Sequence, residues 1–220
     1  MYIFEKAFEI ASTITHNIEG RAADQGSSLP YLISMAIAAG PGDHCEIGTL
    51  WGASAIAVAF AKKEWGFPGK VYCIDPYLPR EQQGVQVNPN ANIPQGTLNG
   101  SPEGLAANAV KFGVEDRIVL MHSKSQPWPG PLANSRFVSA YIDGDHVGHM
   151  PWYDFMELSK RTDHYIALDN FEEAYPAVMA AGLRAMNTGD WTCFYKNGSF
   201  LAMRKNDPAP NRFDGNREQI

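Results

Sequence analysis

Residues 42–62 read GDHCEIGTLWGASAIAVAFAK, and this stretch decides the fold. A short apolar run ends at Glu46, a turn follows through Gly48 and Gly52, and a helical apolar pattern starts near Ser54. Glycine allows backbone torsions that other residues avoid, and it lets the chain come close to a ligand. The stretch therefore predicts a strand, a tight turn and a helix, with a binding site at the turn.

Short apolar segments and helical segments alternate after this turn, which is typical of a parallel sheet covered by helices. Near the end of the chain, two strand-like runs flank Asn197-Gly198, a strong signal for an antiparallel hairpin. We therefore expect an α/β fold whose mostly parallel, seven-stranded sheet ends in an antiparallel β-hairpin. The alternating segments are DHCEI, ASAIAVAFAKK, KVYCID, PEGLAANAVKF, RIVLMH, FVSAYID, MPWYDFMELSKR, HYIALDN and EEAYPAVMAAGLRAM.

We expect one domain with three additions. Residues 1–40 have two apolar patterns of helical spacing and predict an N-terminal helical extension. The main domain covers 41–205, and within it 76–100 is rich in proline, glycine and asparagine, which indicates a lid-like insertion. Residues 206–220 form a polar tail without periodicity.

The helix after this insertion has clear end signals. Ser101 can cap a helix, Pro102 is tolerated in its first turn, and Gly113 is a suitable stop. The sequence therefore predicts a helix between Pro102 and Phe112.

Composition excludes several classes of partner. The chain has 220 residues with 45% hydrophobic composition, enough for one substantial core. Its formal net charge of -6 argues against a surface that neutralises nucleic acid phosphates.

The N-terminal segment carries Glu5, Lys6 and Glu9 within its apolar pattern, so we expect neither a signal peptide nor a membrane span. We predict a cytoplasmic protein.

The three cysteines give no sign of a cross-link or a zinc site. Cys45, Cys73 and Cys193 are odd in number, lie far apart and form no CxxC pair. We expect them to be core residues.

The turn after Glu46 has the spacing ExGxxxGxS, which differs from the GxGxxG that seats a pyrophosphate in dehydrogenases. An acidic side chain here repels pyrophosphate and suits a cofactor with an ammonium and a sulfonium, such as S-adenosylmethionine. Asp75 ends the next strand, where a carboxylate can accept bonds from both ribose hydroxyls of an adenosine. A tight turn with a solvated Glu46, and an aspartate that opens an Asp-Pro turn, are the simpler alternatives.

Acidic and amide side chains follow two later strands. FVSAYIDGDH places Asp143 and Asp145 after one strand, and HYIALDN places Asp169 and Asn170 after the next. These strand ends should be neighbours at the binding edge of the sheet. Carboxylate and amide oxygens select a hard cation such as Mg²⁺, with Ca²⁺ or Mn²⁺ as alternatives. The same residues also form turns by bonding their own backbone, which is the competing interpretation.

The motifs EIGTLWGAS, CIDPY, IDGDH and ALDN together resemble the metal-dependent small-molecule O-methyltransferases. That family includes catechol and caffeoyl-coenzyme A types and relatives that methylate antibiotic sugars. The resemblance covers roughly 42–205. It implies a Rossmann-like class I methyltransferase fold, S-adenosylmethionine and a divalent metal ion as cofactors, and a hydroxylated small molecule as the methyl acceptor.

The resemblance also implies site residues. Asp143 and Asp169 are separated by 26 residues, as the family's metal ligands are, which implies Asp143, Asp169 and Asn170 as ligands and Asp145 outside them. Glu46, Gly48 and Ser54 would hold the methionine end of the cofactor, Asp75 the ribose, and Ser125 with Gln126 the adenine. The full implied cofactor set is Glu46, Gly48, Gly52, Ser54, Asp75, Ser125 and Gln126.

His146 departs from the family pattern, because the plant and animal enzymes have lysine three residues after the first metal aspartate. An imidazole, with an ordinary pKa of about 6.5, can take a hydroxyl proton near neutral pH. The resemblance therefore implies His146 and Asp143 as the catalytic pair. A surface residue at a helix start is the alternative.

Two other functions stay open at this point: a nicotinamide-dependent oxidoreductase on a similar sheet, and a nucleoside-binding protein without chemistry.

We expect a homo-oligomer, with the N-terminal helices as the dimer contact. Five aromatic residues are candidates for an acceptor pocket. The aromatic residues are Trp51, Tyr77, Trp128, Trp152 and Tyr153.

Overall fold

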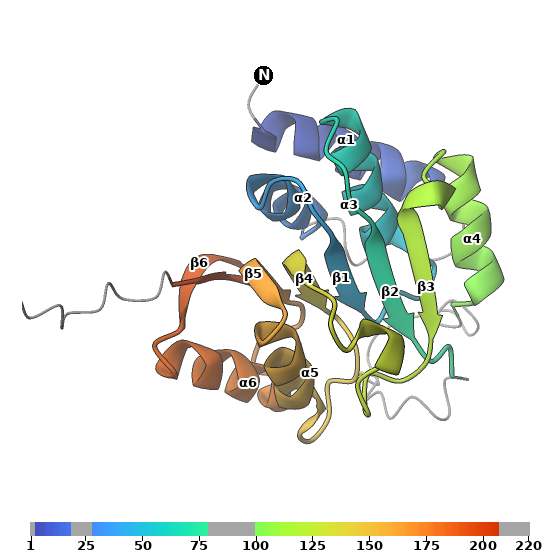
Figure 1. Ribbon diagram of the computed structural model, residues 1–220. Helices are drawn as coiled ribbons and strands as arrows, with labels where there is room; N and C mark the ends of the chain where they lie inside the picture. Colours follow the sequence, from blue (N-terminus) through green and yellow to red (C-terminus); the bar gives the residue numbers. More distant parts are fainter. Residues whose placement is uncertain (1–2, 19–27, 79–99, 207–220) are drawn as a thin grey trace, which may run out of the picture.

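The sheet has seven strands in the order β3-β2-β1-β4-β5-β7-β6, which confirms the predicted fold class. The structure is a computed structural model and describes residues 3–18, 28–78 and 100–206 (Figure 1). Strands β1 to β5 run parallel, and β7 is antiparallel to both β5 and β6. The strands are β1 (His44–Ile47), β2 (Val71–Asp75), β3 (Ile118–His122), β4 (Phe137–Ile142), β5 (Thr162–Leu168), β6 (Trp191–Asn197) and β7 (Phe200–Lys205).

Helices cover both faces of this sheet. Helices α1 to α4 share one apolar cluster on one face, whereas α5 and α6 pack in a second cluster on the other face (Figure 1). The helices are α1 (Ile3–Asn17), α2 (Leu29–Ala38), α3 (Ala53–Glu64), α4 (Pro102–Lys111), α5 (Met150–Ser159) and α6 (Pro176–Asn187), with short 3₁₀ turns η2 (Glu115–Arg117) and η3 (Gly130–Leu132). No described helix is long and apolar enough to cross a membrane.

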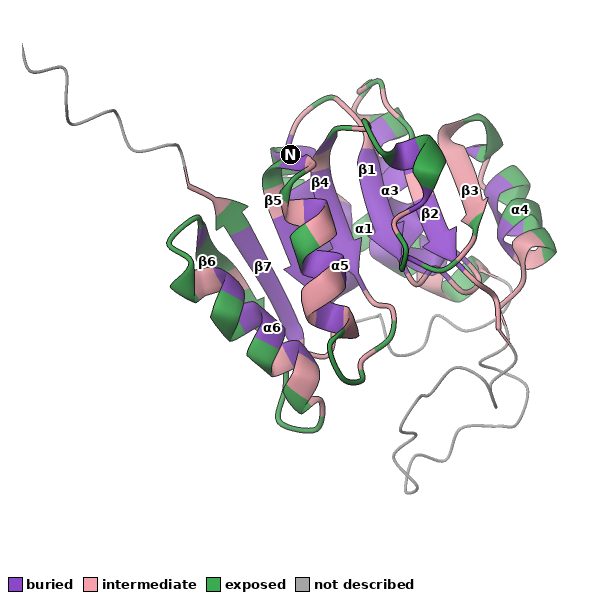
Figure 2. Ribbon diagram, turned by 60° about the horizontal axis from the view of Figure 1, so that its bottom comes forward, coloured by how far each residue is buried: buried purple, intermediate pink, exposed green. Residues whose placement is uncertain are grey.

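Strand β1 is the centre of the fold. It pairs with β2 on one side and β4 on the other, and all four of its residues are buried (Figure 2). Helix α3 follows directly and buries alanines along most of its length, so it lies close to the sheet. This close packing fixes the position of the turn that joins β1 to α3.

Several local predictions are confirmed. The Ser101 hydroxyl accepts a hydrogen bond from the Gly104 N–H at 2.9 Å, and Gly113 ends the helix region with φ of +61°. Gly198 has φ of +54° in the hairpin turn between β6 and β7. Helix α6 starts at Pro176, later than its apolar pattern suggested, because the residues before it form a loop.

The expectation for the cysteines was wrong in one case. Cys45 and Cys73 are buried in β1 and β2, but Cys193 is exposed on β6. Strand β6 lies at the edge of the sheet, and only its first residue is buried. An apolar residue in this strand is therefore not necessarily a core residue. Most of the predicted insertion (79–99) and of the tail (207–220) lies outside the described residues.

His44 predicts how stability depends on pH. Its side chain is fully buried, its Nδ1 lies 2.8 Å from the Ser139 Oγ, and burial, with a smaller contribution from Lys62, lowers its pKa to about 3. The unfolded state therefore binds the proton first, so stability is present above pH 6.5 and is lost as pH falls toward 3. The slope is about 1.4 kcal/mol per pH unit.

We expect that in His44→Gln the free energy of unfolding depends less steeply on pH between 6.5 and 4.5, by about 1.4 kcal/mol per pH unit. Urea unfolding followed by circular dichroism measures this slope. His164→Gln, on an exposed side chain of β5, is the control and should leave the slope unchanged. Equal slopes for His44→Gln and the unmodified protein would show that His44 does not take part.

Candidate active site

Glu46 is the last residue but one of β1 and lies in the interior of the protein. The side chain is fully buried, and its Oε1 accepts a hydrogen bond of 2.6 Å from the Ser54 hydroxyl in the first turn of α3. Its Oε2 has no hydrogen-bond partner among the described residues. Burial raises the pKa of Glu46 well above its ordinary value, and the charges of Asp143 and Asp75 raise it further. The alternative of a solvated glutamate is therefore wrong.

Glycine is required twice in the turn after Glu46. Gly48 has φ of +85° and Gly52 has φ of +84°, both in the left-handed region. A Cβ on Gly48 would lie 2.1 Å from the carbonyl oxygen of Asp143, and one on Gly52 would lie 2.9 Å from the Cγ of Leu105. The turn after β1 thus touches the turn after β4 through backbone atoms.

Asp75 holds this turn in place. Its Oδ2 accepts the backbone N–H groups of Thr49 at 2.8 Å and Leu50 at 3.0 Å, and its Oδ1 accepts that of Tyr77 at 2.7 Å. Leu50 and Tyr77 have φ of +46° and +47°, which is strained for residues with a side chain. The carboxylate therefore acts as the turn former that the simpler interpretation expected, and it lies beside the predicted cofactor turn.

Asp143 and Asp169 are neighbours, as the strand order predicted. The Asp143 N–H donates to Ile47 at 2.9 Å, and the Asp169 N–H donates to Ile142 at 3.0 Å. Burial raises the pKa of Asp169 to about 8, with a further contribution from the charge of Asp143. Asn170 has φ of +54°, a conformation that asparagine tolerates better than most residues. The structure thus brings three predicted metal ligands to one edge of the sheet.

No three His, Cys, Asp or Glu side chains are close enough to hold a metal ion in the ranges that the structure describes. The predicted set contains only two such residues, because its third ligand is an amide. Asp145 is exposed, and its Oδ1 accepts the Val147 N–H at 3.0 Å, so this side chain forms a turn.

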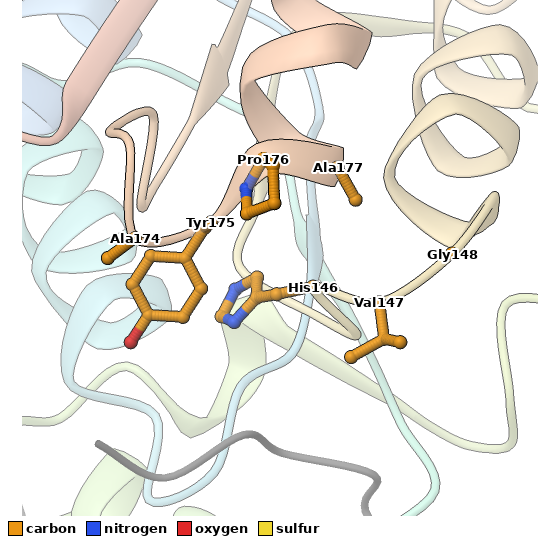
Figure 3. Close-up of a pocket in the computed structure, with 7 residues that line it drawn as sticks. All are labelled: His146, Val147, Gly148, Ala174, Tyr175, Pro176 and Ala177. Carbon is orange, nitrogen blue, oxygen red and sulfur yellow. The ribbon is translucent and has the colours of Figure 1, made fainter.

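His146 lies at a small pocket of about 100 Å³. Its Nε2 is 3.5 Å from the Asp143 Oδ1, an ion-pair distance when the imidazole is protonated. Its ring meets that of Tyr175 edge to face, with centroids 5.1 Å apart (Figure 3). The pocket lies between the loops that follow β4 and β5, and its lining residues are His146, Val147, Gly148, Ala174, Tyr175, Pro176 and Ala177.

The two residues predicted for the adenine side lie after β3 and contact α5. Ser125 is buried, whereas Gln126 is exposed with its Oε1 3.3 Å from the Nε2 of His149. Because β3 runs parallel to β2, they follow the same edge of the sheet as the other predicted residues.

Sequence reasoning missed two tyrosines of the site. Tyr175, and none of the five aromatic candidates, lines this pocket. Tyr141 is buried in β4, and its hydroxyl donates a hydrogen bond to the carboxylate of Asp169. Tyr141 stands two residues before Asp143, so strand alternation could have placed it on the same side, but Tyr175 follows no regular pattern.

The sheet order and the acidic residues at its carboxyl edge define a Rossmann-like class I methyltransferase fold. Residues 45–170 match the model of a protein family described as a methyltransferase domain, and the chain belongs to this family of enzymes. Membership favours methyl transfer over the oxidoreductase and the non-catalytic alternatives.

Solved structures support the same fold. A putative caffeoyl-CoA O-methyltransferase from Staphylococcus aureus superposes with a TM-score of 0.62 at 12% identity, over 91% of this chain and 92% of that chain. The O-methyltransferase NovP gives a TM-score of 0.59 at 14% identity, over 93% and 79%. TomG from Streptomyces achromogenes, an O-methyltransferase in complex with SAM, gives 0.56 at 16% identity, over 94% and 91%. No curated protein sequence matches the chain.

The contact between Gly48 and Asp143 predicts a stability difference between two glycine variants. Gly40 has φ of +82°, close to that of Gly48, but a Cβ there would meet nothing within 4 Å. Gly40→Ala should therefore cost only the torsional strain, roughly 1–2 kcal/mol. Gly48→Ala should cost at least about 2 kcal/mol more, because overpacking adds to the strain. Urea unfolding measures both, and equal losses would contradict the close backbone contact.

Proposed function

We propose that the protein is an S-adenosylmethionine-dependent O-methyltransferase that uses a divalent metal ion and methylates a hydroxyl group of a small molecule. The observation that carries the proposal is the contact of Gly48 with the carbonyl of Asp143. It joins the turn that follows the buried Glu46 of β1 to the turn after β4 that carries Asp143. Such a contact lets a methyl donor and a metal-assisted acceptor lie side by side.

The residues of the β1 turn fit this cofactor. The buried Oε2 of Glu46 has no partner in the described part of the chain, and an ammonium group satisfies such an oxygen. Asp75 already accepts three backbone N–H groups. Because a carboxylate has about four acceptor positions, one remains for a ribose hydroxyl. A bond to each of the two hydroxyls would require Asp75 to give up one backbone donor.

The strand ends of β4 and β5 fit a hard cation. Asp143, Asp169 and Asn170 offer two carboxylates and an amide oxygen, which is the ligand type of Mg²⁺, with Mn²⁺ or Ca²⁺ as alternatives. Tyr141 orients one of these carboxylates through its hydroxyl, as outer hydrogen bonds do in metal sites. A divalent cation bound there supplies positive charge that lowers the pKa of a nearby hydroxyl.

The proposal assigns the acceptor hydroxyl to the pocket at His146. Its walls are apolar apart from the imidazole and the Tyr175 hydroxyl, and it opens beside Asp143. In the proposed reaction, His146 takes the proton of the acceptor hydroxyl. The acceptor oxygen then forms a bond to the methyl carbon while the carbon–sulfur bond breaks, and S-adenosylhomocysteine and the methyl ether leave. Alignment of the two reactants accounts for up to about 7–11 kcal/mol of the lowered barrier in favourable cases.

The metal assignment is tested by Mn²⁺ binding, followed through the electron paramagnetic resonance signal of the free ion. Asp143→Ala should lower Mn²⁺ affinity by at least about 100-fold, since even outer partners of ligands cost 10–100-fold. Its affinity for S-adenosylhomocysteine should stay within about threefold. Asp145→Ala, in the same turn, is the matched control and should lose less than about tenfold in Mn²⁺ affinity. Equal losses in the two variants would contradict Asp143 as the ligand.

The base is tested by transfer of radiolabelled methyl from S-adenosylmethionine to 3,4-dihydroxybenzoate and to a methyl glycoside, with Mg²⁺ present. We expect the wild-type protein to methylate at least one acceptor class and to stop when the metal is chelated. His146→Ala should lower kcat by about 10²–10⁴, the usual contribution of a general base. His164→Ala, at the far end of β5, should keep full activity. Unchanged turnover after exhaustive chelation would remove the metal from the proposal.

A further inference from the structure

Asp154 is a buried carboxyl group that the proposed reaction does not use. It lies in the first half of α5 and is fully buried. Neither of its oxygens has a hydrogen-bond partner of good geometry among the described residues. A carboxyl group in a protein interior costs free energy when its hydrogen bonds are poorly formed, so the retention of Asp154 calls for an explanation.

The position of Asp154 is between two loops of the site. A Cβ on Gly144, in the turn between the two aspartates after β4, would lie 3.5 Å from the Asp154 Oδ2 and 2.9 Å from the Cγ2 of Ile47. The hydroxyl of Ser125, in the loop after β3, also faces the Asp154 carboxyl. Asp154 therefore lies next to the Ser125 side chain of the predicted adenine loop and next to the turn that carries Asp143.

Two further contacts join this end of α5 to the loop after β3. The Trp128 N–H donates to the Tyr153 hydroxyl oxygen at 3.0 Å, and the Nε2 of His149 lies 3.3 Å from the Oε1 of Gln126. Helix α5 begins directly after the turn that contains His146. The start of α5 thus connects the predicted adenine loop with the turn of the proposed base.

We propose that Asp154 is a positioning residue that holds the Ser125 hydroxyl for the cofactor and supports Gly144, so that both loops keep a fixed separation. This inference rests on the proposed function, because it assigns the loop after β3 to the adenine side. The carboxyl group acts through Ser125 and Gly144 and touches neither reactant.

The energetics agree with a functional role. Burial, opposed by the Ser125 hydroxyl and assisted by the charge of Asp145, raises the pKa of Asp154 to about 7. The charges of Asp154 and of Arg161, which follows α5, both act on the buried Cys45 of β1. Since the folded-state pKa is above the unfolded value of about 3.8, stability is lost as pH rises from there past 7. Residues that cost stability are expected where function requires them.

Substitution by leucine separates the two roles. Leucine has the branched shape of aspartate but no polar atoms, so Asp154→Leu should fold, with a melting temperature at pH 7.5 no lower than about 3 °C below the wild type. In isothermal titration, however, its Kd for S-adenosylhomocysteine should rise at least about tenfold. Asp154→Asn keeps a hydrogen-bonding group and should bind within about threefold of the wild type.

Two more variants complete the experiment. Thr162→Val removes another buried, unpartnered polar atom, at the start of β5, and should leave the affinity unchanged. Ser125→Ala should weaken binding about as much as Asp154→Leu, and the double variant should add little, because the two side chains act together.

Each other result overturns the inference. It fails if Asp154→Leu binds as tightly as the wild type, if its affinity falls only in step with its melting temperature, or if it does not fold. It also fails if the double variant loses as much binding free energy for S-adenosylhomocysteine as Ser125→Ala and Asp154→Leu lose together. Absence of S-adenosylhomocysteine binding in the wild type would instead overturn the proposed function, and the inference with it.

Discussion

The backbone contact between Gly48 and the Asp143 carbonyl is the constraint on which the site depends. It exists because β1 and β4 are adjacent in the sheet, although more than ninety residues of sequence, from His44 to Ser139, separate their paired positions. Adjacent strands of opposite crossover direction leave room for a ligand at their carboxyl ends. Only glycine allows the two turns to meet there, so Glu46 and the acids of β4 and β5 share one edge of the sheet.

Much of the fold follows from the sequence because its local signals agree with one another. The apolar runs of β1 to β5, the capping hydroxyl of Ser101 and the Asn-Gly turn before β7 all depend on contacts near in sequence. The common edge of the acidic residues after β4 and β5 could also be predicted, because parallel strands bring their carboxyl ends together. Their role as metal ligands stays a prediction. These residues stand directly after strands, where strand register alone determines their position.

What the sequence did not predict depends on contacts between distant loops. Tyr175 reaches His146 from the loop before α6, and the position of that loop follows from helix packing. Asp154 falls within a plain helical pattern, and its burial beneath Gly144 depends on how α5 packs on the sheet. The burial of Glu46 and the exposure of Cys193 have the same origin, since neighbouring strands determine how much solvent reaches each position.

The most direct test of the account is a crystal structure with S-adenosylhomocysteine and Mn²⁺, with the ion located by its anomalous scattering. The account predicts that the adenosine lies across the turn from Glu46 to Gly52, its ribose on Asp75, and that one ion lies between Asp143 and Asp169. A nucleoside bound elsewhere would contradict the assignment of the cofactor turn. An ordered cofactor without an ion at these carboxylates would contradict metal-assisted transfer.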